Sequence, residues 1–217
     1  MSKSVKASPG VPRGQRQVAR TEGRVLAAAA RLFLERGYAA TTLTDVAEAA
    51  DVGERTVYVR FGSKALLFKR VVDVAVVGDT APVDVLGRDW MELSFSAPTL
   101  EERIRATASA NRQILERTGA LFAVAQQAAA VEPLIAEFWQ QGREGMRYGQ
   151  RMVWTRMAGD GLLPTGCDLE WIIDTASVVS SPETYLLTTR MMGWDLDTYE
   201  AWLVTTLRRL STGPALD

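Results

Sequence analysis

Two short helical stretches joined by a tight turn, within residues 44–61, constrain the fold of this chain more than any other feature. The first stretch starts at Thr44, whose hydroxyl suits a helix N-cap. The residues between the two stretches, Asp-Val-Gly, suit a tight turn. Aspartate tolerates the left-handed conformation, and glycine can start the next helix, ERTVYVRF. Ala47, Val52 and Val57 recur at equal intervals and can fill the crossing of the two helices. The segment therefore predicts a helix-turn-helix.

The rest of the chain also shows helical periodicity, without β-alternation or internal repeats. Thr99 and Glu102 form a capping-box pattern at the start of one of these helices. The expected helices cover residues 15–36, 64–77, 99–117, 119–131, 133–160, 167–180, 182–192 and 197–210. We expect an all-α fold, with a disordered basic arm (residues 1–15), a three-helix helix-turn-helix domain (16–78) and a larger helical domain (79–217).

The amino-acid composition excludes several kinds of functional site. The chain has no histidine and one cysteine, Cys167, so histidine-based catalysis, histidine zinc ligands and an intrachain disulfide are excluded. We expect no cofactor, metal site or catalytic residue. No apolar run approaches the roughly 20 residues that span a bilayer, and the first residues lack a signal-peptide pattern, so we expect a cytoplasmic protein without a membrane partner.

The net charge of −1 conceals a division along the chain. Residues 1–70 carry 13 Lys and Arg against 6 Asp and Glu, whereas residues 71–217 carry 12 against 20. A basic N-terminal third indicates that this part meets a polyanion, although a solvated basic tail gives the same count.

The second helix of the helix-turn-helix carries the groups that reading DNA requires. Arg55 can bind guanine, whereas Thr56 and Tyr58 can contact phosphate or a thymine methyl. Lys64 suits a phosphate, and the arm, with residues up to 24, can reach the adjacent backbone or minor groove. The predicted partner is double-stranded DNA, and the candidate contacts are Thr42, Thr44, Gly53, Glu54, Arg55, Thr56, Tyr58, Val59, Arg60 and Lys64.

The segment RVLAAAARLFLERGYAATTLTDVAEAADVGERTVYVRFGSKALLFKRVVD resembles the N-terminal domain of the TetR family of bacterial regulators. The likeness rests on F-x-x-x-G-Y, T-T-x-x-D-V-A-x-x-A and T-V-Y-x-x-F-x-S-K-x-x-L. It implies a homodimer with one DNA-binding head per subunit, a C-terminal domain that binds a small effector, and a leaning to repression. Asp51, Gly53, Val59 and Arg60 depart from the commonest family pattern, so the operator sequence stays unassigned.

In the second domain, helix 133–160 carries aromatic and methionine side chains that suit an apolar pocket. Gly142, Gly145 and Gly149 lie on one face of it and indicate the close approach of another helix or a ligand. Asn111 lies in an apolar stripe and binds either the effector or a neighbouring helix. The candidate effector-binding residues are Asn111, Phe122, Trp139, Met146, Met152, Trp171 and Thr175.

The last three helices present apolar residues that one subunit can leave uncovered, so we expect a two-fold interface there. The candidate interface residues are Val178, Leu186, Leu187, Trp202, Leu203 and Leu210. Two other functions stay open: a helical enzyme that uses Asp174 with Glu170 or Glu183, and a helical interaction module that binds no DNA.

Overall fold

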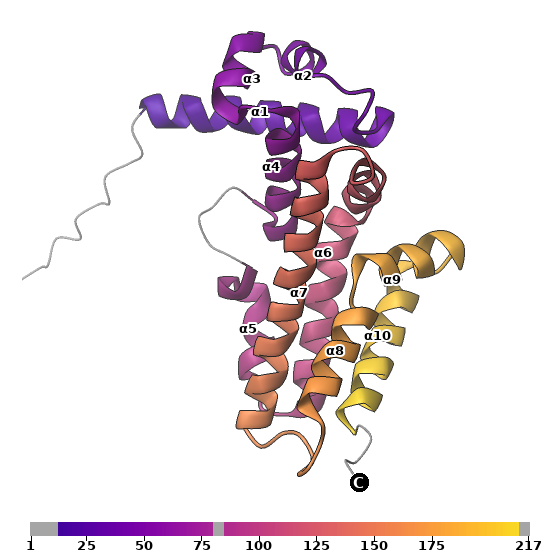
Figure 1. The fold of residues 1–217 in the computed structure, drawn as a ribbon. Coiled ribbons are helices and arrows are strands. Elements are labelled where there is room, and N and C mark those ends of the chain that lie inside the picture. The colour runs from indigo at the N-terminus through magenta and orange to yellow at the C-terminus, as the bar shows by residue number, and fades with distance from the viewer. Residues whose placement is uncertain (1–12, 80–84, 213–217) are drawn as a thin grey trace, which may run out of the picture. The chain divides into compact units, whose positions relative to one another are not determined.

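The computed structural model describes residues 13–79 and 85–212, and all regular structure in these ranges is helical (Figure 1). The predicted all-α fold is confirmed. The helices are α1 (Arg13–Arg36), α2 (Leu43–Ala49), α3 (Glu54–Phe61), α4 (Lys64–Val77), α5 (Asp89–Ser96), α6 (Leu100–Ala128), α7 (Pro133–Gly159), α8 (Leu169–Val179), α9 (Pro182–Leu186) and α10 (Leu196–Ser211), with a 3₁₀ turn at Val85–Gly87 and a π-helix at Leu187–Met191. Most of the predicted arm lies outside the described residues.

The chain divides into two compact units, Met1–Val71 and Val72–Asp217, and the division falls within α4. The domain limits predicted at residues 15 and 78 stay predictions. Along the described ranges, no helix combines the length and the apolar character that a membrane span needs.

The first unit is built around buried apolar side chains from all four helices. Phe33 stacks edge to face on Phe68, with ring centroids 4.9 Å apart, and Tyr38 packs against both rings. Gly37 ends α1 with a φ of 79°, as expected for a left-handed C-cap.

The start of α2 differs from the prediction. Thr42, rather than Thr44, is the N-cap, and its hydroxyl accepts a hydrogen bond from the backbone N–H of Asp45 at 3.1 Å. The Asp45 carboxylate in turn accepts from the Thr42 N–H at 2.8 Å. This reciprocal pair needs a spacing of three residues, which Thr42 has and Thr44 lacks.

A carboxylate on α1 joins three helices of this unit. Glu22 accepts hydrogen bonds from Arg60 of α3 and from Arg70 of α4, the latter with Nη2–Oε1 at 3.1 Å. The Glu22 side chain is only 19% exposed, so the pairing is partly shielded from water. The hydrogen bond from Arg60 is the main cause that lowers the pKa of Glu22, against the opposing effect of burial.

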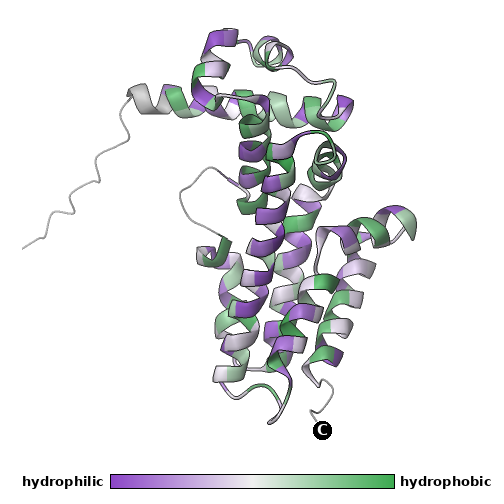
Figure 2. Ribbon diagram, viewed as in Figure 1, coloured by the Kyte–Doolittle hydropathy of each residue, from purple (hydrophilic) through white to green (hydrophobic). Residues whose placement is uncertain are grey.

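The second unit packs α5–α10 around a core to which Trp154, Ile172 and Leu207 contribute fully buried side chains. Helix α6 lies against α5, α7, α9 and α10. Figure 2 shows apolar and polar residues alternating along the helices, which is the pattern of amphipathic helices.

Residues 100–128 form one helix, so the prediction of two helices that break near Gly119 was wrong. Position 119 needs a glycine because it packs against a residue that is distant in the sequence. A Cβ atom at Gly119 would lie 2.4 Å from Cε1 of Tyr185, so the tyrosine ring occupies the space that any larger residue needs. Similarly, the helix expected over 182–192 is α9 followed by the π-helix.

Gly119→Ala is expected to destabilise the protein, although alanine favours helix. Overpacking against Tyr185 costs about 1–3 kcal/mol, which outweighs the gain of up to about 1 kcal/mol in helix propensity. Urea denaturation at fixed protein concentration measures the difference.

Gly145→Ala on α7 is the matched control, because a Cβ atom there meets nothing within 4 Å. It should raise the free energy of unfolding by up to about 1 kcal/mol. A Gly119→Ala protein as stable as Gly145→Ala would contradict the packing explanation.

Glu22→Gln is expected to lower the free energy of unfolding at neutral pH. It should also make that free energy depend less on pH in the acidic range. Because the folded-state pKa of Glu22 lies below the ordinary 4.5, its charge stabilises the fold above about pH 4.5. That contribution is lost as the pH falls through the lowered pKa. Unfolding midpoints between pH 3 and 7 test this.

The control is Glu35→Gln on the same helix, which breaks only an exposed pair with Arg31 at 3.0 Å. Such pairs contribute roughly 0.3–0.5 kcal/mol. Equal pH profiles for the Glu22→Gln and wild-type proteins would rule out the proposed role of Glu22.

Candidate nucleic-acid interface

The turn between α2 and α3 has the geometry that the sequence predicts. Asp51 adopts a φ of 50°, and Gly53 is the N-cap of α3 without a side-chain hydrogen bond. The N–H of Val52 donates to the carbonyl of Ala47 at 3.0 Å. Val57 is fully buried and Ala47 is 2% exposed, so the crossing of the two helices is tightly packed.

Arg24 of α1 fixes this turn from outside. Its guanidinium donates to the carbonyl of Ala50, with Nε–O at 3.0 Å, and also to the carbonyl of Asp51. Its Nη2 lies 3.2 Å from the Asp51 carboxylate. The arginine therefore satisfies carbonyl groups that the end of α2 leaves without helical partners.

The outer face of α3 is open. Glu54, Arg55 and Thr56 are exposed, and Tyr58 and Val59 are 62% and 75% exposed. Because Val57 and Phe61 anchor the opposite face, the short helix presents these five side chains together. Phe61 belongs to the core, with 8% of its surface exposed.

Two predicted DNA contacts have partners within the unit. Arg60 is held by Glu22, and Lys64 donates through Nζ to the carbonyls of Tyr38 and Ala39 at 2.9 and 3.4 Å. The Lys64 ammonium also lies 4.3 Å from the centroid of the Tyr38 ring. Both cations therefore contribute to the packing of the unit.

Of the two threonines predicted to contact DNA, one has a partner within the unit and the other is exposed. The Thr42 hydroxyl donates to Asp45 at 2.6 Å, so its proton is engaged in the capping box. Thr44 is exposed inside α2. Sequence reasoning missed the positioning roles of Glu22 and Arg24. The sequence offers one indication of these roles: a glutamate stands two residues before an arginine on a helix whose polar residues are mainly basic.

In the second unit, Asn111 is bonded within the protein. Its Nδ2 donates to the carbonyl of Ser180 at 2.9 Å, and its Oδ1 accepts from the Tyr199 hydroxyl at 2.8 Å. Burial raises the pKa of Tyr199, which keeps this hydroxyl a donor. The neighbouring-helix alternative for Asn111 is thus the one observed.

The other candidate effector residues are only partly brought together. Phe122 and Trp139 meet edge to face, with ring centroids 5.6 Å apart. Met152 and Trp171 are 41% and 39% exposed, and Met146 and Thr175 are half-buried.

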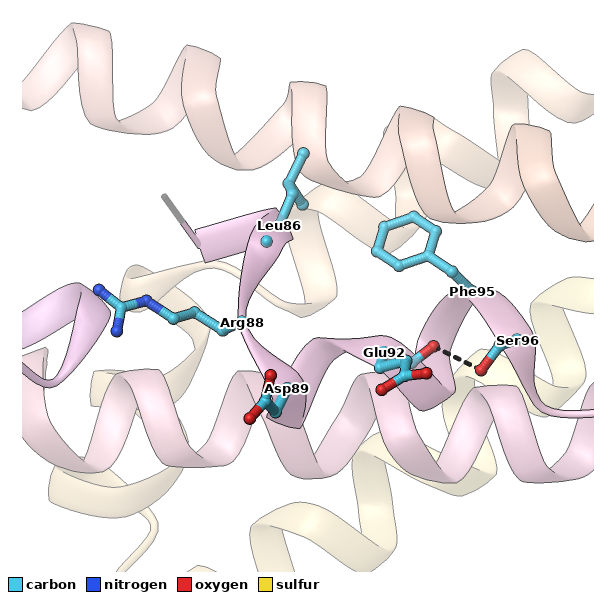
Figure 3. Close-up of a pocket in the computed structure, with 7 residues that line it drawn as sticks. Leu86, Arg88, Asp89, Glu92, Phe95 and Ser96 are labelled. Atoms are coloured by element: carbon cyan, nitrogen blue, oxygen red, sulfur yellow. Dashed lines mark hydrogen bonds between the residues drawn. The ribbon is translucent and has the colours of Figure 1, made fainter. Parts of the chain in front are cut away.

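A hollow of about 300 Å³ lies elsewhere, beside α5. Its lining includes the apolar Leu86 and Phe95 and the charged Arg88, Asp89 and Glu92 (Figure 3). None of the candidate effector residues lines it.

The expected close approach at Gly142, Gly145 and Gly149 is not observed within the described part of the subunit. A Cβ atom at any of the three would meet nothing within 4 Å. Gly142 and Gly145 are exposed, and Gly149 is half-buried.

Two candidate interface residues were predicted wrongly. Leu203 is fully buried and Leu210 is 8% exposed, because both lie on the side of α10 that packs into the core of their own subunit. Val178 and Leu187 are 65% and 47% exposed, whereas Leu186 and Trp202 are half-buried.

The carboxylates of the enzyme alternative are paired with arginines. Asp174 lies 2.6 Å from Arg147, and Glu170 lies 2.5 Å from Arg151. The hydrogen bond from Arg151 lowers the pKa of Glu170, which is the opposite direction from that needed by a general acid. Across residues 13–79 and 85–212, no three His, Cys, Asp or Glu side chains gather where they could hold a metal ion.

Part of the first unit matches the model of a known protein family. Residues 25–71 match the model of the bacterial regulatory proteins of the tetR family. The HTH-type transcriptional regulator TtgR of Pseudomonas putida is 38% identical over 63 residues, which cover 29% of this chain and 30% of TtgR. The matched stretch thus spans less than a third of that relative.

Solved structures resemble most of the chain. A protein of Rhodococcus sp. assigned to the TetR family aligns with a TM-score of 0.69 at 12% identity, covering 88% of this chain and 98% of its own. The SmeT–triclosan complex aligns with a TM-score of 0.69 at 16% identity, covering 87% and 90%. At these identities the likeness shows the fold alone, and the likeness to a family rests on residues 25–71. The helix-turn-helix segment of this chain, residues 25–71, is thus similar to the bacterial regulatory proteins of the tetR family.

Proposed function

We propose that the chain is a ligand-responsive, DNA-binding transcriptional regulator that acts as a repressor. The observation that carries this proposal is the outer face of α3, where Arg55, Tyr58 and Val59 are exposed on a rigidly anchored helix. A guanidinium and apolar side chains on one helix face suit base edges and thymine methyl groups in the major groove.

Groups around α3 suit the phosphates that flank it. The Thr44 and Thr56 hydroxyls are exposed, and backbone N–H groups at the start of α4 can bind a phosphate. Lys64 and Arg60 can contribute charge at longer range while keeping their partners in the unit. The contact proposed for the arm falls mostly on residues outside those described.

An apolar or aromatic effector is part of this proposal. The Phe122–Trp139 pair offers half-buried aromatic surface in the second unit. SmeT, which shares the fold, is solved with triclosan, a small aromatic molecule. We infer that an effector in this unit releases the protein from a palindromic operator.

A homodimer completes the proposal. Val178, Leu187 and the adjacent Met191, which is 70% exposed, leave apolar surface along α8 and the π-helix. A second copy would cover this surface and place two α3 helices on one DNA face, roughly 34 Å or a multiple apart.

Arg55→Ala is expected to weaken binding to the preferred DNA sequence by about 1–3 kcal/mol, because one base contact is lost. A gel-shift titration against the DNA upstream of the gene measures this at several salt concentrations. Arg31→Ala, on an exposed face of α1, removes the same charge as a control. Unchanged base preference in Arg55→Ala would refute its role, and salt-insensitive binding by the wild type would refute the function.

Val178→Glu is expected to shift the protein from dimer to monomer, because a carboxylate would be buried unpaired in the interface. Light scattering at micromolar concentration detects the change. Leu93→Glu on α5 is the control, since Leu93 is 61% exposed and lies outside the proposed interface. A wild-type monomer, or a Val178→Glu dimer, would rule out this interface.

A further inference from the structure

Two neighbouring side chains in the first turn of α3 carry opposite charges and bind nothing within the described residues. Glu54 and Arg55 are both exposed, and within the described residues neither side chain makes a hydrogen bond or an ion pair. The third charged residue of this helix, Arg60, is held by Glu22. The charges that α3 offers outward are therefore one carboxylate and one guanidinium.

A carboxylate on this face is costly if the face meets DNA. Like charges repel, so Glu54 weakens binding to every phosphate backbone regardless of sequence. Within a complex with DNA, a hydrogen bond that the carboxylate accepts from a base offsets this cost. Cytosine presents its N4 amino group in the major groove, and glutamate is a recognised acceptor for it.

We propose that Glu54 determines specificity by accepting a hydrogen bond from cytosine N4, beside the guanine bound by Arg55. This inference rests on the proposed function. It assigns each half-site a cytosine, and it gives Glu54 two opposite effects: weaker binding to DNA in general and selection of one base.

The competing role of Glu54 is local. An acidic residue in the first turn stabilises a helix through the helix dipole, and the Gly53 N-cap supplies no side-chain hydrogen bond. That role predicts a change in thermal stability without any change in base preference. The two roles are therefore separable by measurement.

The experiment uses the full chain and begins by selecting preferred sites from random double-stranded DNA with the wild type. Fluorescence anisotropy then measures binding to the preferred site, to its single-base variants and to random-sequence DNA for each protein. The proteins are wild type, Glu54→Ala, Glu54→Gln and Glu48→Gln. Glu48 is exposed on α2 with no side-chain partner in the described residues, so its variant removes the same charge away from α3. Melting temperatures confirm folding.

We expect all three variants to bind random-sequence DNA more tightly than the wild type does. Only the Glu54 variants should lose the preference for one cytosine per half-site, by about 5- to 150-fold. Glu54→Gln should prefer adenine at that position, since glutamine matches the adenine edge. Replacing the cytosine base by 2-pyrimidinone, which lacks the amino group, should weaken the wild type and leave Glu54→Ala unaffected.

The inference is overturned if Glu54→Ala and Glu54→Gln keep the wild-type base preferences, whether or not their stability changes. It is also overturned if 2-pyrimidinone is tolerated by the wild type. A wild-type protein that selects no sequence overturns the proposed function itself. If selection succeeds, the function stands and the variants test Glu54 alone.

Discussion

The orientation of α3 depends on its burial against the rest of its unit. Eight residues are too few to hold a helix in water, so α3 exists because Val57 and Phe61 pack into the core. Polar contacts from α1 then fix both of its ends. Arg24 holds the turn before it, and Glu22 holds Arg60 in its last turn. The exposed face can vary in sequence because the contacts that hold α3 come from its buried face and its two ends.

The sequence predicted this unit well because its signals are local. A left-handed aspartate, an N-cap glycine and buried residues at fixed spacing are all readable within about fifteen positions. The error at Thr44 was also local, since two threonines precede Asp45 and only one has capping-box spacing. By contrast, the prediction of a helix break near Gly119 was wrong because the reason for this glycine, the ring of Tyr185, lies far along the chain.

The candidate site also depends on contacts between residues that are distant in the sequence, which the sequence alone does not reveal. The sequence reveals which cations exist near α3, but it does not reveal that a carbonyl binds Lys64 or that Glu22 binds Arg60. It also places Leu203 on an apolar helix face without indicating whether a second copy or the same subunit covers that face. Such partners are set by tertiary packing, so exposed and engaged groups are distinguished only in the folded chain.

The amide of Asn111 ties three helices together at one buried point. It bonds to the end of α8 and to the hydroxyl of Tyr199 on α10 while lying on α6. Sliding one of these helices along another would break hydrogen bonds between buried groups. Such rupture costs more in an apolar interior than in solvent. These three helices are thus locked in register, and motion within the second unit must come from elements that this amide does not reach.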